Sequence, residues 1–293
     1  MRSYNPKEWS RIILDFHKSD TLRKLIPVLI AMAVYAWIIA YVELHYISAA
    51  RKEHLKNISI IHTLLGFVLS MLLVFRTNTA YDRWWEGRKL WGGLVNNSRN
   101  LALKLSGLIS KDDVNEHAFF CELIPRFALE LKNHLQADSS RYSLDEFDHP
   151  EIPNFDRFRH VPEQIAGTIT ERLIQLQNQQ KITGEQLLFV NNEVSAFMDI
   201  CGACERIRNT PIPFSYSSFI KKFILFYTLT LPIGYVFSLG YFIIPVVVFI
   251  LYALASLELI AEEIEEPFGK DENDLPMERI IETITKNVGE ILR

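Results

Sequence analysis

Carboxylates gather in one stretch of the sequence, between Glu258 and Pro276. Pro267 and Gly269 predict that a helix ends there, and the acidic side chains around this point are Glu262, Glu263, Glu265, Glu266, Asp271, Glu272 and Asp274. Carboxylates at the negative end of a helix dipole repel one another, so solvent, salt or a cation must relieve them. Oxygen ligands suit a hard cation such as Ca²⁺, although the alternating EF-hand pattern is absent. The stretch is therefore either a solvated acidic patch or a cation site.

A second pattern consists of large apolar side chains. Phe67, Met71 and Phe75 recur every fourth residue in a run, Ile58 to Phe75, that contains no Asp, Glu, Lys or Arg. Such spacing places them on one face of a helix. They either contact lipid or a protein core, or they form apolar rings that gate water and ions once several copies assemble about an axis. Spacing alone leaves both interpretations open.

Other candidate chemistry is sparse. Cys201 and Cys204 form a CxxC, but no second pair of Cys or His stands at zinc-finger spacing, and we interpret the two as small packing residues. His62 lies in the apolar run, where it either lines a wet cavity or hydrogen-bonds to a neighbouring helix. No P-loop, Rossmann glycine pattern, nucleophile elbow or HExxH motif occurs. The sequence therefore predicts no enzyme.

The composition indicates a membrane part joined to a soluble part. Of the 293 residues, 49% are hydrophobic and 23% are charged, and the net charge is -4. No basic run is long enough to follow a phosphate backbone, so we expect no nucleic-acid partner. The first 24 residues are polar and charged, without the apolar core of a signal peptide, which predicts a retained, cytosolic N-terminus.

Long uncharged runs predict four membrane-spanning helices. The first covers Leu25 to Tyr41, and the second covers Ile58 to Phe75 and continues as helix to Arg88. The uncharged run from Phe223 to Leu257 is too long for one crossing, so a turn near residues 238–240 should divide it into two spans. Positive charge before the first span and after the second places these ends, and with them both termini, in the cytosol.

The rest of the chain predicts amphipathic helices outside the membrane. The expected divisions are a cytosolic amphipathic segment (1–24), a first transmembrane pair whose second helix extends into the cytosol (25–91), a helical cytosolic domain (92–213), a second transmembrane pair (214–262), and an acidic segment with a C-terminal cytosolic helix (263–293). The expected fold is an all-α membrane protein with a large helical cytosolic domain.

Three separated motifs carry a resemblance that covers nearly the whole chain. They are FRTNTAYDRWWEGRKLWG from Phe75, CGACERIRNTPIPFSY from Cys201 and EEIEEPFGKDENDLP from Glu262. With these motifs in this order, the chain resembles the bacterial branch of the bestrophin family. The resemblance implies a homopentameric ion channel with four transmembrane helices per subunit, a large helical cytosolic region and a central pore along the fivefold axis.

The resemblance also assigns roles to residues. Family members line a narrow membrane neck with three apolar side chains on the second span, and counting back from the first motif places them at Phe67, Met71 and Phe75. The family's cytosolic constriction falls near Glu185, or at Leu187 or Leu188 if the register slips.

A metal site is implied as well. Animal bestrophins bind Ca²⁺ through carbonyls and carboxylates in a segment similar to the third motif, and the matching carboxylates are Glu263, Glu266, Asp271 and Asp274. We expect that no cofactor is required, and that a divalent cation, Ca²⁺ or Zn²⁺, can occupy this acidic segment.

The predicted function is passive conduction of small monovalent ions. Five copies of Glu185 would form an acidic ring that favours Na⁺ or K⁺, and chloride conduction, as in animal bestrophins, is the main variant. The alternative class is a non-conducting membrane scaffold or metal-responsive sensor. The expected partners are the lipid bilayer, further copies of the chain and monovalent ions, and the expected location is the bacterial inner membrane.

Overall fold

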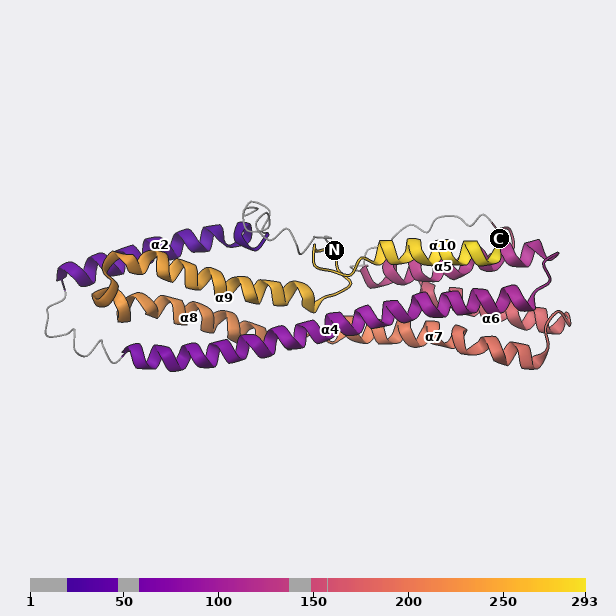
Figure 1. Cartoon of the computed structure of the whole chain (residues 1–293), viewed down its shortest axis with the longest axis horizontal. Coiled ribbons are helices and arrows are strands. Elements are labelled where there is room, and N and C mark those ends of the chain that lie inside the picture. Colours follow the sequence, from indigo (N-terminus) through magenta and orange to yellow (C-terminus); the bar gives the residue numbers. More distant parts are fainter. Residues whose placement is uncertain (1–19, 47–57, 137–148, 157) are drawn as a thin grey trace. The chain divides into compact units, whose positions relative to one another are not determined.

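The computed structural model describes residues 20–46, 58–136, 149–156 and 158–293, and every regular element in these ranges is a helix (Figure 1). The helices are α2 (Asp20–Tyr46), α4 (Ile58–Leu108), α5 (Val114–Gln136), α6 (Val161–Asn178), α7 (Gly184–Asn209), α8 (Phe214–Leu239), the 3-10 turn η3 (Gly240–Phe242), α9 (Ile243–Glu265) and α10 (Met277–Leu292). The expected all-α fold is confirmed for this part of the chain. Most of the predicted N-terminal segment lies outside the described residues.

Three stretches of the described chain are long and apolar enough to cross a membrane, and they are Thr21–Tyr46, Ile60–Leu108 and Phe214–Glu265. The third stretch contains two helices, α8 and α9, of 26 and 23 residues. Gly240 ends α8 with a φ of 55°, a conformation that glycine adopts without steric cost. The turn predicted near residues 238–240 is therefore confirmed.

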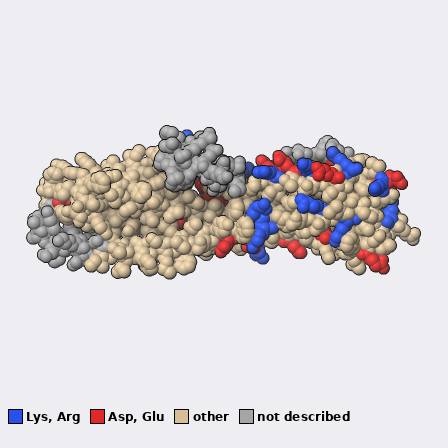
Figure 2. Space-filling view, in the orientation of Figure 1, with Lys and Arg blue, Asp and Glu red and all other residues tan. Residues whose placement is uncertain are grey.

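One compact unit contains Arg2–Asp82 and Ile212–Glu265, and we call it the apolar unit. Within it, α2, α8 and α9 pack against one another, and the first part of α4 adds Leu69 and Leu73 to their core. Figure 2 shows a surface over these helices that is nearly bare of charge. Large apolar side chains such as Phe249 stay exposed on it, as expected of helices that meet lipid or other copies.

The second compact unit contains Arg83–Pro211 and Glu266–Arg293, and we call it the polar unit because charged side chains cover it (Figure 2). In it α6 packs against both α5 and α7, and α10 packs on α5. The rings of Phe127 and Phe197 stack at 4.8 Å in its core. Ile284 and Val288 bury the apolar face of α10, so the C-terminal helix docks on this part of the chain.

Helix α4 runs for 51 residues, longer than the sequence predicted. At Gly87, the segment of α4 in the polar unit lies close to the residues that follow α9. A Cβ atom at this position would lie 3.2 Å from the Phe268 ring and 3.3 Å from Pro267. The missing side chain permits this approach. Gly107, in the same helix, has no such neighbour within 4 Å among the residues that the structure describes.

Side-chain caps fix where two helices of the polar unit begin. Thr183 and Gln186 form a reciprocal capping box at the start of α7. His160 caps α6, because its Nδ1 accepts the backbone N–H of Glu163. These caps position Glu185 in the first turn of α7 and the imidazole of His160 at the start of α6.

Candidate pore, acidic segment and histidine cluster

The three neck candidates lie on a face of α4 that the chain itself does not cover. Phe67, Met71 and Phe75 are 68%, 50% and 55% exposed. Leu69 and Leu73 bury the face roughly opposite, at about 100° of rotation per residue. The three side chains are thus available to lipid or to other copies, and their place around a pore stays a prediction.

Polar contacts determine which way this part of α4 faces. The hydroxyl of Thr230 donates to a carbonyl of its own helix, so its oxygen accepts the Nε2–H of buried His62 at 2.9 Å. A Cβ at Gly66 would lie 2.8 Å from the hydroxyl oxygen of Tyr227, so α4 and α8 approach closely here. Of the two interpretations of His62, hydrogen bonding to a neighbouring helix is confirmed. An imidazole that is buried in apolar surroundings needs such a partner, so this bond resists rotation of the helix.

Arg76 links α4 to α9 through a buried ion pair. Its Nη2 lies 2.6 Å from Glu265 Oε2, and its Nε lies 3.4 Å from Glu258 Oε1. Arg76 is 1% exposed. Sequence reasoning missed this pair, although an arginine directly after a long uncharged run was a usable signal.

The crowded glutamates at the end of α9 have protein cations as partners. The ion pairs are Lys24–Glu263 at 3.1 Å, Lys221–Glu262 at 2.8 Å and Arg76–Glu265 at 2.6 Å. Basic side chains from α2, α8 and α4 therefore offset much of the electrostatic repulsion that the sequence predicted among these carboxylates. One predicted metal ligand, Glu263, is already engaged with Lys24.

The other three predicted ligands lie in the polar unit, between α9 and α10. Glu266 and Asp271 are exposed, whereas Asp274 is 2% exposed. Asp274 Oδ2 accepts the backbone N–H of Asp271, but among the described residues Oδ1 has no hydrogen-bond partner. Burial and the neighbouring carboxylates of Asp271 and Glu266 raise the pKa of Asp274 to about 6. A buried carboxylate oxygen without a partner is a group that a cation would stabilise.

Glu185, the constriction candidate, is the second residue of α7 and is exposed. Hydrogen bonds from its own N–H and from the Thr183 hydroxyl hold the pKa of Glu185 below its ordinary value, so the carboxylate is charged at neutral pH. Of the two alternatives, Leu187 packs against the core of the polar unit and Leu188 is 71% exposed. Their roles in a pore stay predictions too.

A cluster that the sequence did not predict joins α5, the start of α6 and α7. His134 Nε2 and His160 Nε2 lie 2.6 and 2.8 Å from the same atom, Glu205 Oε1. Burial lowers the pKa of His134. Burial opposes ionisation of Glu205, but hydrogen bonds from both imidazoles outweigh it and lower the pKa of Glu205. Among the described residues, these three side chains form the group whose ligand atoms lie close enough to one another to hold a metal ion.

Near this cluster, the two cysteines of the CxxC pack in the core. Cys201 and Cys204 are fully buried and form no disulfide, which confirms the packing interpretation. Burial raises the pKa of Cys201 to about 12 and also raises that of Cys204. Cys201 Sγ lies 3.9 Å from His160 Nε2. Buried thiols of this kind are unreactive.

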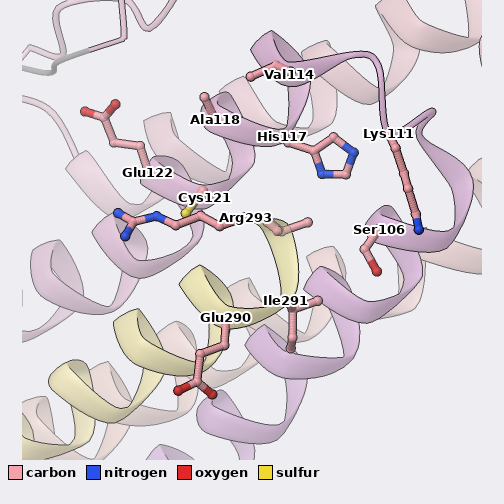
Figure 3. Close-up of a pocket in the computed structure, with 11 residues that line it drawn as sticks. Ser106, Lys111, Val114, His117, Ala118, Cys121, Glu122, Glu290, Ile291 and Arg293 are labelled. Atoms are coloured by element: carbon pink, nitrogen blue, oxygen red, sulfur yellow. The ribbon is translucent and has the colours of Figure 1, made fainter.

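A cavity of about 790 Å³ opens between the ends of α4, α5 and α10 (Figure 3). Basic, acidic and apolar side chains line it. The charged ends of Lys111, Glu122 and Glu290 are spread around the cavity instead of meeting at one point. None of the predicted site residues lines this cavity, and its charges do not define a particular ligand.

Comparisons with known proteins agree with these features. The family model of the bacterial/fungal bestrophin protein matches residues 1–290. A voltage-dependent anion channel-forming protein of Nostoc sp. is 36% identical over 230 residues, which cover 77% of this chain and 75% of that relative. A protein of the same name from Ralstonia nicotianae is 30% identical over 276 residues, which cover 92% and 87%.

A solved structure resembles the fold. The crystal structure of a bacterial bestrophin homologue from Klebsiella pneumoniae, obtained by Zn-SAD phasing, matches with a TM-score of 0.76 and 24% identity, covering 92% of this chain and 98% of that chain. The match of the family model over nearly every residue, together with relatives at 30% identity and above, is decisive. This chain belongs to the bacterial and fungal bestrophin family.

Proposed function

We propose that several copies of this chain form a channel through which small monovalent ions cross a membrane passively. The relatives compared above are named as channel-forming proteins, and the family is one of membrane channels, not of enzymes. The observation that carries the proposal is the exposed apolar face of α4 that contains Phe67, Met71 and Phe75. Copies of this face around an axis would form three apolar rings, which can gate ions by dewetting.

The proposed channel has five copies, the number that the resemblance implies. The apolar unit lies in the bacterial inner membrane, with α2, α8, α9 and the first part of α4 as four spans, and the polar unit and both termini lie in the cytosol. Native mass spectrometry of the detergent-solubilised protein should give five chains per particle. A stable monomer or dimer that passes no current would instead support the non-conducting scaffold.

The neck assignment can be tested by side-chain truncation. Phe67→Ala, Met71→Ala and Phe75→Ala should each widen a ring and raise single-channel conductance in planar bilayers. Phe249→Ala is the matched control, because Phe249 is 68% exposed like Phe67 but lies on another helix of the apolar unit, α9. If the three variants conduct like the parent, the neck lies elsewhere. If no protein conducts, the channel proposal itself fails.

Glu185 supplies the proposed ion preference. Its carboxylate is exposed and charged, and a ring of such groups favours Na⁺ or K⁺ over Cl⁻. The names of the relatives point to anions instead, so they lend the cation preference no support. Reversal potentials in asymmetric NaCl separate the two preferences.

We expect a reversal potential on the cation-selective side of zero, and Glu185→Gln should move it towards the anion-selective side. Glu171→Gln neutralises another exposed carboxylate of the polar unit and should leave the potential unchanged. A strongly chloride-selective current in the parent would refute the cation preference while leaving the channel in place.

We also propose that the acidic segment accepts a divalent cation at Asp274, with Glu266 and Asp271 beside it. The buried Oδ1 of Asp274, which has no hydrogen-bond partner among the described residues, supports this site. Oxygen ligands favour Ca²⁺ over a softer ion. Ca²⁺ should raise the melting temperature of the parent and have no such effect on Asp274→Asn. An equal shift in both proteins would place the cation elsewhere.

A further inference from the structure

We propose that His134, His160 and Glu205 bind a Zn²⁺ ion in the polar unit. The donor atoms come from α5, from the residue that caps α6 and from α7, and they lie within 4.8 Å of one another. Both imidazole Nε2 atoms approach the same carboxylate oxygen, at 2.6 and 2.8 Å. An ion at this point would tie the three helices together.

The donor set selects the kind of metal. Two imidazole nitrogens and one carboxylate oxygen form a known zinc ligand set, in which the fourth position is open. Ca²⁺ and Mg²⁺ prefer oxygen ligands, so two imidazoles disfavour them. The three side chains are 25–29% exposed, and a water molecule can therefore reach the fourth position.

The spacing needs only a small adjustment. When bonds of about 2.0 Å meet tetrahedrally at zinc, neighbouring donor atoms lie about 3.3 Å apart, so the nitrogens and the oxygen must separate by roughly half an ångström.

His160 uses both of its ring nitrogens, and zinc binding would change the role of each. Its Nδ1 accepts the backbone N–H of Glu163, so Nε2 carries the proton that is donated to Glu205. Coordination through Nε2 moves this proton to Nδ1 and gives up the capping bond. Asn is among the best N-cap residues, so His160→Asn removes the ligand while α6 stays capped.

The test uses the full-length protein in detergent, stripped with a chelator and titrated with ZnCl₂ by calorimetry. We expect one zinc ion per chain at this site, and His160→Asn and Glu205→Gln should each weaken its binding by at least about tenfold. Two controls should bind zinc like the parent: His117→Asn, on the same helix α5, and Glu171→Gln, an exposed carboxylate of α6. X-ray absorption at the zinc edge should show imidazole ligands in the parent.

Zinc binding that is absent from the parent, or unchanged in both His160→Asn and Glu205→Gln, overturns the proposal. Circular dichroism identifies any variant that fails to fold. His134→Gln, which removes another of the three ligands, then takes the place of that variant. None of these measurements involves ion conduction. The zinc site and the proposed channel can therefore fail independently of each other.

Discussion

Replacing Arg76 with methionine tests whether the buried ion pair holds α4 against α9. Arg76 is 1% exposed and lies 2.6 Å from Glu265 and 3.4 Å from Glu258. Methionine has a similar length but no charge, so the variant leaves both carboxylates in the apolar unit without this cation. Removing one partner of a buried ion pair costs about 3–5 kcal/mol. We expect the free energy of unfolding to fall by about 4 kcal/mol in Arg76→Met.

A second substitution shows whether the stranded carboxylates cause that loss. Glu258 is 3% exposed as a side chain, and among the described residues its Oε2 has no hydrogen-bond partner. Adding Glu258→Gln to Arg76→Met removes this uncompensated charge. The double variant should therefore regain about 1–3 kcal/mol relative to Arg76→Met alone, as expected for two residues in direct contact.

The assay is unfolding of the detergent-solubilised protein by SDS, followed by circular dichroism. Lys221→Met is the matched control, because the Lys221–Glu262 pair is exposed, at 47% and 51%. Exposed pairs contribute less than about 1 kcal/mol. The reasoning is wrong if Arg76→Met destabilises the protein no more than Lys221→Met does.

Three further predictions concern the polar unit. In Gly87→Ala the new Cβ would meet packed side chains at 3.2 Å, whereas in Gly107→Ala it would meet no described atom within 4 Å. Gly87→Ala should therefore be less stable than Gly107→Ala by about 1–3 kcal/mol. Denaturant titration of both variants measures the difference. The raised pKa of Asp274, about 6, means that its stabilising contribution is present below about pH 4 and lost as pH rises to 6. In metal-free buffer Asp274→Asn should remove this loss and be more stable at pH 7 by on the order of 1–3 kcal/mol, and an unchanged pH profile of unfolding would contradict this. Iodoacetamide should label half-buried Cys121 before Cys201, whose pKa of about 12 and burial protect it; mass spectrometry of the native protein checks the order.

Local signals in the sequence determined most of the secondary structure. Uncharged runs and helical spacing predicted α2, α4, α8, α9 and α10, and a glycine between two long apolar runs located the turn at Gly240. These features depend on residues that are close in sequence, and backbone propensity and hydropathy are local properties. The motifs likewise supported the family before any fold was known.

The sequence could not identify the partners of the charged residues. It showed crowded carboxylates at the end of α9, but Lys24 and Arg76, which neutralise two of them, lie far away in the chain and on other helices. It also could not distinguish exposed Asp271 from buried Asp274. The side chains that meet depend on how whole helices pack, and that is decided by many weak contacts at once.

By itself, the sequence determined that Phe67, Met71 and Phe75 share one helical face, because a regular helix fixes that geometry. Tertiary structure decided that the chain itself leaves this face uncovered, whereas it buries Leu69 and Leu73 on the opposite side. It also brought His134, His160 and Glu205 to one point from three helices. No local pattern encodes that meeting, because the three residues are separated by long segments whose paths are set by packing in the core.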